Sequence, residues 1–123
     1  MRAWAKGVPC AEAAVELLIG HRWWLRRRDF AGVAVKPGRN VFTGTVVAEV
    51  DFAAAAAALG RGLLPCSLGD AGVLRIAASL AVGVPVDMRE AAGCLDAADA
   101  ALVARAVCLA AGCHVRLVTE TRP

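Results

Sequence analysis

The stretch from Leu68 to Val82 is apolar nearly all round, and it constrains the fold more than any other part of the chain. Beyond the first turn its only polar side chains are Arg75 and Ser79, which are four residues apart and share one stripe of a helix. A helix that is hydrophobic on almost every side must be covered by other elements. No stretch reaches the roughly 18 uninterrupted apolar residues of a membrane helix. We therefore predict a buried central helix in a soluble, cytoplasmic domain without a membrane partner.

The length of 123 residues fits a single domain over residues 1–123, with a core large enough to fold without disulfide bonds or structural metal ions. Residues 1–9 and 119–123 are expected to be loose. The N-terminus has no apolar segment typical of a signal peptide. The net charge of +3 is too small to indicate a nucleic-acid partner by itself. The excess of alanine, glycine and arginine is typical of a GC-rich genome and suggests a bacterial source.

A first amphipathic helix is predicted from Pro9, which suits a first helical turn, to about Arg28. At about 100° per residue, one face of this helix is expected to join the core. That face comprises Ala14, Leu17, Leu18, His21, Trp24, Leu25 and Arg28. The outward face comprises Glu12, Glu16, Ile19, Trp23, Arg26 and Arg27. The two adjacent tryptophans are thus predicted to point in opposite directions, with Trp24 buried and Trp23 exposed.

The hydrophobic period then changes to that of a β-hairpin, with strands at Phe30–Lys36 and Val41–Val50 and a turn at Pro37–Asn40. Acidic or hydroxyl N-caps followed by terminating glycines predict four further helices. These are Phe52–Leu59, Leu68 to about Val82, a short helix ending near Gly93, and Ala97–Ala111. Residues 114–119 form either a third strand or a tail. The predicted fold class is α+β: an N-terminal helix, an antiparallel hairpin and a cluster of four helices.

The sequence contains no motif that indicates an enzyme, a cofactor or a metal site. Its five cysteines are scattered without CxxC spacing, which favours free reduced thiols in a chain without an export signal. Cys108, Cys113 and His114 carry the right donor atoms for zinc but the wrong spacing. We therefore predict no catalytic residue, no cofactor and no metal, and we do not predict an enzyme.

His21 is the most notable titratable residue, because it falls among apolar residues on the predicted core face. We expect it to lie at the edge of the core and to hydrogen-bond a backbone carbonyl. Asp29 is eight positions further on and lies beyond side-chain reach on the same helix. The sequence indicates no partner that would give His21 a catalytic role.

The basic end of the first helix is the candidate contact surface. An exposed tryptophan beside arginines has the composition of a protein-interface hot spot, which predicts an interface, with self or another protein, at Ile19, Trp23, Arg26 and Arg27. The alternative is phosphate binding in an accessory nucleic-acid-binding protein through Arg22, Arg26, Arg27, Arg28 and Arg39. A third reading is a solvated helix end that merely suits the helix dipole. The leading hypothesis is a small non-enzymatic interaction module, self-associating as a homodimer.

Overall fold

The computed structural model describes residues 8–39 and 46–113, which form one short 3₁₀ turn, six α-helices and a two-stranded hairpin. The order is α2 (Pro9–His21), the turn η1 (Trp24–Arg26), α3 (Arg28–Ala34), β1 (Val35–Arg39), β2 (Val46–Val50), α4 (Phe52–Gly60), α5 (Leu68–Val82), α6 (Met88–Gly93) and α7 (Ala97–Ala110). The predicted α+β class is confirmed. The alternative third strand at 114–119 lies outside the described residues, as do the N-terminal arm up to residue 7 and residues 120–123. None of the described helices is long and apolar enough to cross a membrane.

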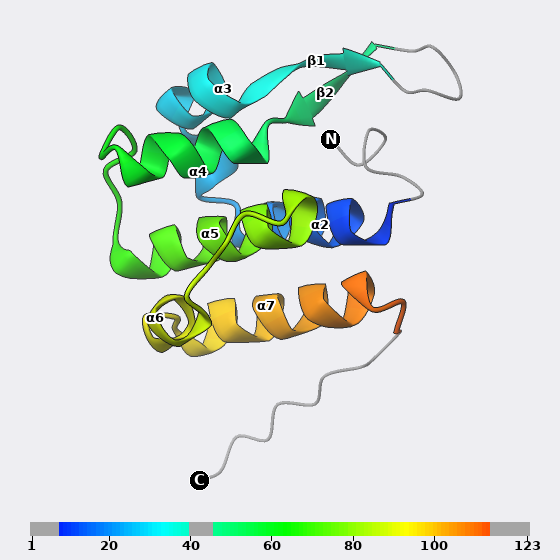
Figure 1. Cartoon of the computed structure of the whole chain (residues 1–123), viewed down its shortest axis with the longest axis vertical. Helices are drawn as coiled ribbons and strands as arrows, with labels where there is room; N and C mark the ends of the chain where they lie inside the picture. The colour runs from blue at the N-terminus through cyan, green and yellow to red at the C-terminus, as the bar shows by residue number, and fades with distance from the viewer. Residues whose placement is uncertain (1–7, 40–45, 114–123) are drawn as a thin grey trace, which may run out of the picture.

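Three layers make up the fold (Figure 1). Helices α2 and α5 form the middle layer, with α3, α4 and the hairpin on one side and α6 and α7 on the other. Helix α5 packs against α2, α4, α6 and α7, which confirms that the apolar stretch of the sequence is the central helix.

The predicted helix starts are confirmed by their caps. The side chains of Asp51, Ser67, Asp87 and Asp96 each accept a hydrogen bond from the backbone N–H three residues on. Each bond satisfies one of the donors that the first turn of a helix leaves unpaired. The predicted end of α5 is also confirmed, because Gly83 adopts a left-handed conformation with φ of 73°.

The predicted extent of the first helix is wrong. Helix α2 ends at His21, and Arg22 has a positive φ of 68° while its N–H closes the last turn onto the carbonyl of Leu18. The chain turns here because burial of the Trp24 side chain stabilises the fold more than a further turn of α2 would. The indole ring of Trp24 is fully buried, and its Nε1 donates to the carbonyl of Asp70 at 2.9 Å. The residues after His21 therefore do not share faces with α2.

The predicted first strand and turn are also displaced. Residues 28–34 form helix α3, on which Phe30 and Ala34 occupy successive turns and are both buried. The four-residue spacing of Phe30 and Ala34 is that of one helix face. The valines of this segment have a high strand propensity, which is why we predicted a strand. Strand β1 begins only at Val35 and includes Pro37–Arg39, which we expected in the turn. The register pairs Lys36 with Glu49, and residues 40–45 lie outside the described part.

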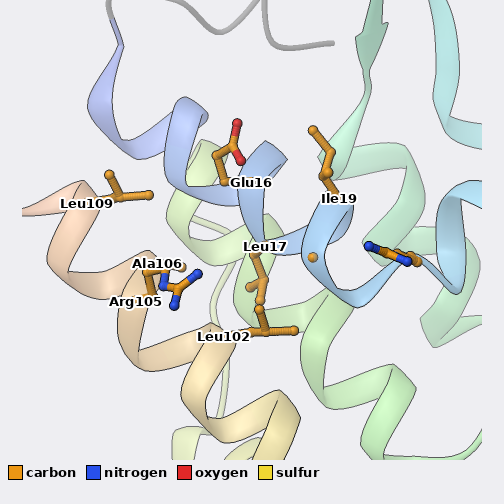
Figure 2. Close-up of a pocket in the computed structure, with 9 residues that line it drawn as sticks. Glu16, Leu17, Ile19, Leu102, Arg105, Ala106 and Leu109 are labelled. Atoms are coloured by element: carbon orange, nitrogen blue, oxygen red, sulfur yellow. The ribbon is translucent and has the colours of Figure 1, made fainter. Parts of the chain in front are cut away.

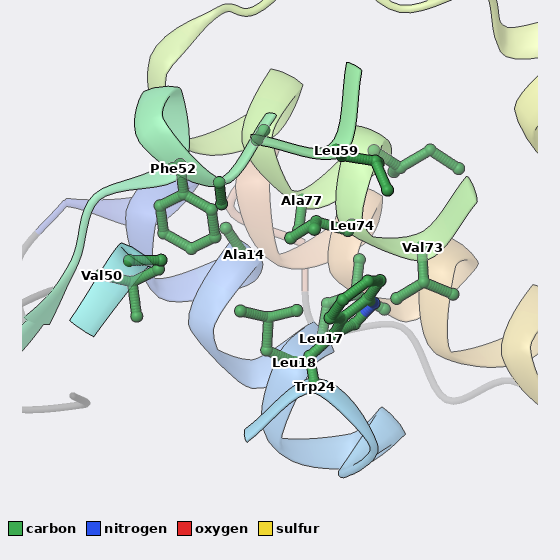
Figure 3. Close-up of a cluster of buried hydrophobic side chains, with 14 of the residues drawn as sticks. Ala14, Leu17, Leu18, Trp24, Val50, Phe52, Leu59, Val73, Leu74 and Ala77 are labelled. Atoms are coloured by element: carbon green, nitrogen blue, oxygen red, sulfur yellow. The ribbon is translucent and has the colours of Figure 1, made fainter. Parts of the chain in front are cut away.

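The core extends through the middle layer, where Trp24 lies close to Leu17 and Leu18 and faces α5 (Figure 3). Phe52 of α4 and Val50 of β2 close one end of it. Gly72 explains how closely α6 approaches α5. A Cβ atom at position 72 would lie 2.6 Å from the carbonyl oxygen of Ala91, so only glycine fits without moving backbone.

Asp51 should make the stability of the fold depend on pH. Its pKa is lowered, first by the hydrogen bond from the N–H of Ala54 and then by the ammonium of Lys36 at 3.0 Å. A carboxyl group with a lowered pKa in the folded state stabilises the fold above its unfolded pKa of about 3.9, and this contribution is lost as the pH falls through the folded pKa.

We expect Asp51→Ala to lower the free energy of unfolding by about 1 kcal/mol at pH 7, the usual loss for a missing N-cap. In urea titrations the difference from the wild type should shrink below about pH 4, where the carboxylate becomes protonated. Asp51→Asn is the control, because an amide oxygen can still cap α4 without titrating. A difference for Asp51→Ala that stays constant down to pH 2 would contradict the electrostatic contribution.

Candidate functional site

Two features of the described residues stand out: a cluster of titratable side chains at the ends of three helices, and a shallow groove between α2 and α7. The cluster consists of His21, Asp70 and Asp99, and we call it the His21 cluster. His21 is the last residue of α2, while Asp70 and Asp99 lie in the first turns of α5 and α7.

The imidazole of His21 lies between the two carboxylates. Its Nδ1 is 3.1 Å from Oδ1 of Asp99 and within hydrogen-bond geometry. Its Nε2 is 3.1 Å from Oδ1 of Asp70. Only 6% of the His21 side chain is exposed, against 20% for Asp70 and 16% for Asp99. The imidazole is therefore buried, and the carboxylates are the more exposed side of the cluster.

Helix dipoles favour the positions of the two carboxylates. The N-termini of α5 and α7 carry partial positive ends, which suit the aspartates in their first turns. A hydrogen bond from Ser67 fixes Asp70, whose Oδ2 accepts from the Ser67 hydroxyl at 2.7 Å. The cluster thus joins three of the packed helices through their ends.

The expected environment of His21 was incorrect. Its placement at the edge of the core is confirmed, but its partners are carboxylates instead of a backbone carbonyl. From the sequence we did not connect His21 with Asp70 or Asp99, which lie in the first turns of α5 and α7. They lie 49 and 78 residues from His21, so no local pattern connects them to it. The sequence offered one hint: a histidine on a predicted core face, and two predicted helices that each begin with an acidic residue in the first turn.

Arg27, which we predicted as an interface or phosphate contact, is engaged within the chain. Its guanidinium lies over the indole rings of Trp23 and Trp24, at 4.7 and 5.1 Å from their centroids. It also pairs with Asp29, with Nε 2.8 Å from Oδ1, and donates to the carbonyl of Pro65. The Arg27 hydrogen bond is the main reason why the pKa of Asp29 is lowered. These contacts hold η1 against the start of α5.

Ile19 lies instead beside the groove between α2 and α7, which encloses about 210 Å³ (Figure 2). Its lining residues are Glu16, Leu17, Ile19, Gly20, Arg22, Leu102, Arg105, Ala106 and Leu109. The floor is shallow because Gly20 lets α7 approach closely: a Cβ there would be 2.7 Å from a methyl group of Leu102. The lining combines apolar side chains of both helices with the charged residues Glu16, Arg22 and Arg105.

The other predicted contact residues are distributed around this end of the molecule. Arg22, Arg26 and Arg28 are exposed, and Trp23 keeps 37% of its surface open. Arg39 ends β1, but its side chain lies outside the described part. The structure thus brings Ile19 and Arg22 together at the groove, whereas Trp23 and Arg27 form a separate stack.

Comparison of this chain with protein-family models, with curated proteins and with solved structures gave no match.

Proposed function

We propose that this protein is a non-enzymatic interaction module that self-associates through the exposed side of α2, with the α2–α7 groove as the centre of the contact. The observation that supports it most is the composition of this open groove, which combines apolar side chains with charged residues of both signs. Interfaces between subunits commonly combine an apolar centre with a polar rim.

The charges of the rim suit a second copy of the same chain. Glu16 and Arg22 are of opposite sign, and Ile19 lies midway between them in sequence. A two-fold axis near Ile19 would bring each Glu16 opposite Arg22 of the other copy and place the two Ile19 side chains together. Such a self-complementary patch is what a two-fold symmetric dimer requires. Trp23 and Arg26, which follow Arg22 in the chain, would lie at the edge of this contact.

Sedimentation velocity over a concentration series tests the proposal. We expect a monomer–dimer equilibrium that persists in high salt, because the centre of the contact is apolar. Ile19→Asp and Arg22→Glu should each weaken dimerisation by at least about tenfold, which corresponds to about 1.4 kcal/mol. The double variant Glu16→Arg/Arg22→Glu should recover much of the loss of Arg22→Glu, because it restores opposite signs across the axis.

Leu63→Asp is the matched control, since Leu63 is 58% exposed and lies outside the groove, between α4 and α5. It should dimerise like the wild type. A wild-type chain that stays monomeric at several hundred micromolar would refute the proposal. Retention of that monomer on heparin, lost steeply with salt, would instead favour phosphate binding through Arg22, Arg26 and Arg28.

A further inference from the structure

The Nε2 atom of His21 is buried and makes no hydrogen bond to any residue that the structure describes. Oδ1 of Asp70 lies 3.1 Å from it, but this contact does not have the direction of a hydrogen bond. Buried polar atoms are nearly always paired, and one that is not calls for an explanation. The explanation has to account for a carboxylate oxygen that lies only 3.1 Å from this nitrogen.

The surroundings of the other ring nitrogen point to a metal ion. In protein metal sites, the histidine that binds the ion usually donates its second N–H to a carboxylate, which fixes the ring and its tautomer. His21 has such a partner, because its Nδ1 lies 3.1 Å from Oδ1 of Asp99. With the proton on Nδ1, Nε2 carries a lone pair that is free to bind an ion, and Oδ1 of Asp70 lies 3.1 Å from it.

The separation of Nε2 and the Asp70 oxygen is close to that of two ligands of one ion. Zinc binds histidine nitrogen and carboxylate oxygen at about 2.0–2.2 Å, so two neighbouring ligands at the tetrahedral angle lie about 3.3–3.5 Å apart. The observed 3.1 Å is slightly shorter, so a small movement of Asp70 would admit the ion. The donor atoms of all three residues lie within 4.8 Å of one another.

We propose that the His21 cluster binds Zn²⁺ or a chemically similar divalent first-row ion. His21 Nε2 and Asp70 are the ligands, and Asp99 orients the imidazole. Ser67 holds the second oxygen of Asp70. Imidazole together with carboxylate favours zinc over magnesium, which prefers oxygen ligands alone. A structural zinc site has four protein ligands. Here the protein supplies fewer, so water molecules on the carboxylate side complete the coordination shell and the ion is exchangeable. This site is independent of the proposed dimer contact.

Titration of the reduced full-length chain with Zn²⁺ and, separately, with Co²⁺ tests the proposal. We expect one ion per chain at this site, with no competition from equimolar Mg²⁺. Asp70→Asn should abolish this binding, and Asp99→Asn should weaken it by about 10–100-fold, the usual effect of losing the partner that orients a ligating histidine. Asp87→Asn is the control, because Asp87 caps α6 away from His21. It should bind like the wild type.

Because the chain has five cysteines, the Co²⁺ complex must also be shown to lack thiolate ligands. Its absorption spectrum should contain no sulfur-to-metal charge-transfer band. In ¹⁵N spectra of the wild type, Zn²⁺ should shift the Nε2 resonance of His21 while Nδ1 keeps its proton. Unchanged His21 resonances at saturating Zn²⁺ would overturn the proposal, and so would full Co²⁺ binding to folded Asp70→Asn.

Discussion

Trp24→Ala is expected to lower the free energy of unfolding by about 3–5 kcal/mol, the range measured for large aromatic side chains removed from a core. The indole of Trp24 is fully buried and packs against Phe30, with ring centroids 5.6 Å apart. Alanine would leave a cavity and would also remove the hydrogen bond from the indole Nε1 to the carbonyl of Asp70. The loss would be a large fraction of the 5–15 kcal/mol that stabilises a typical domain.

Trp23→Ala is the matched control for this experiment. Its ring is 37% exposed and meets Trp24 edge to face, with centroids 4.9 Å apart. We expect a loss of about 1 kcal/mol or less, because only one aromatic contact and the stacking of Arg27 disappear. Urea unfolding followed by far-ultraviolet circular dichroism measures both variants without relying on tryptophan fluorescence. Equal losses for the two variants would show that their different burial has no energetic consequence.

The helices after the hairpin could be predicted from the sequence because their signals are local. An N-cap needs only its own side chain and the N–H three residues on, as Asp87 and Asp96 show. The apolar surface of α5 likewise identified it as central before any partner helix was known. Opposite exposure of Trp23 and Trp24 was predicted as well, although the assumed geometry was a continuous helix.

The residues from Arg22 to Ala34 could not be predicted correctly, because tertiary contacts decide their conformation. Arg22 adopts a positive φ, which its own sequence neighbourhood does not require. The turn is held by contacts of Trp24 with Asp70 and of Arg27 with Pro65, which are 46 and 38 residues away in the sequence. The His21 cluster has the same origin, since its three residues meet only when α2, α5 and α7 pack together.

Leu74→Ala tests the central position of α5, with an expected loss of about 2–5 kcal/mol in the free energy of unfolding. Leu74 is completely buried, so the shorter alanine side chain would leave a cavity among its neighbours. Leu80, on the same helix, is only partly buried, so Leu80→Ala should cost clearly less, by about half. The two substitutions remove the same atoms from one helix, and thus their difference isolates burial from helix propensity. Urea unfolding with a common m-value is the measurement. A loss below about 1 kcal/mol for Leu74→Ala would mean that α5 is not the helix around which the other layers pack.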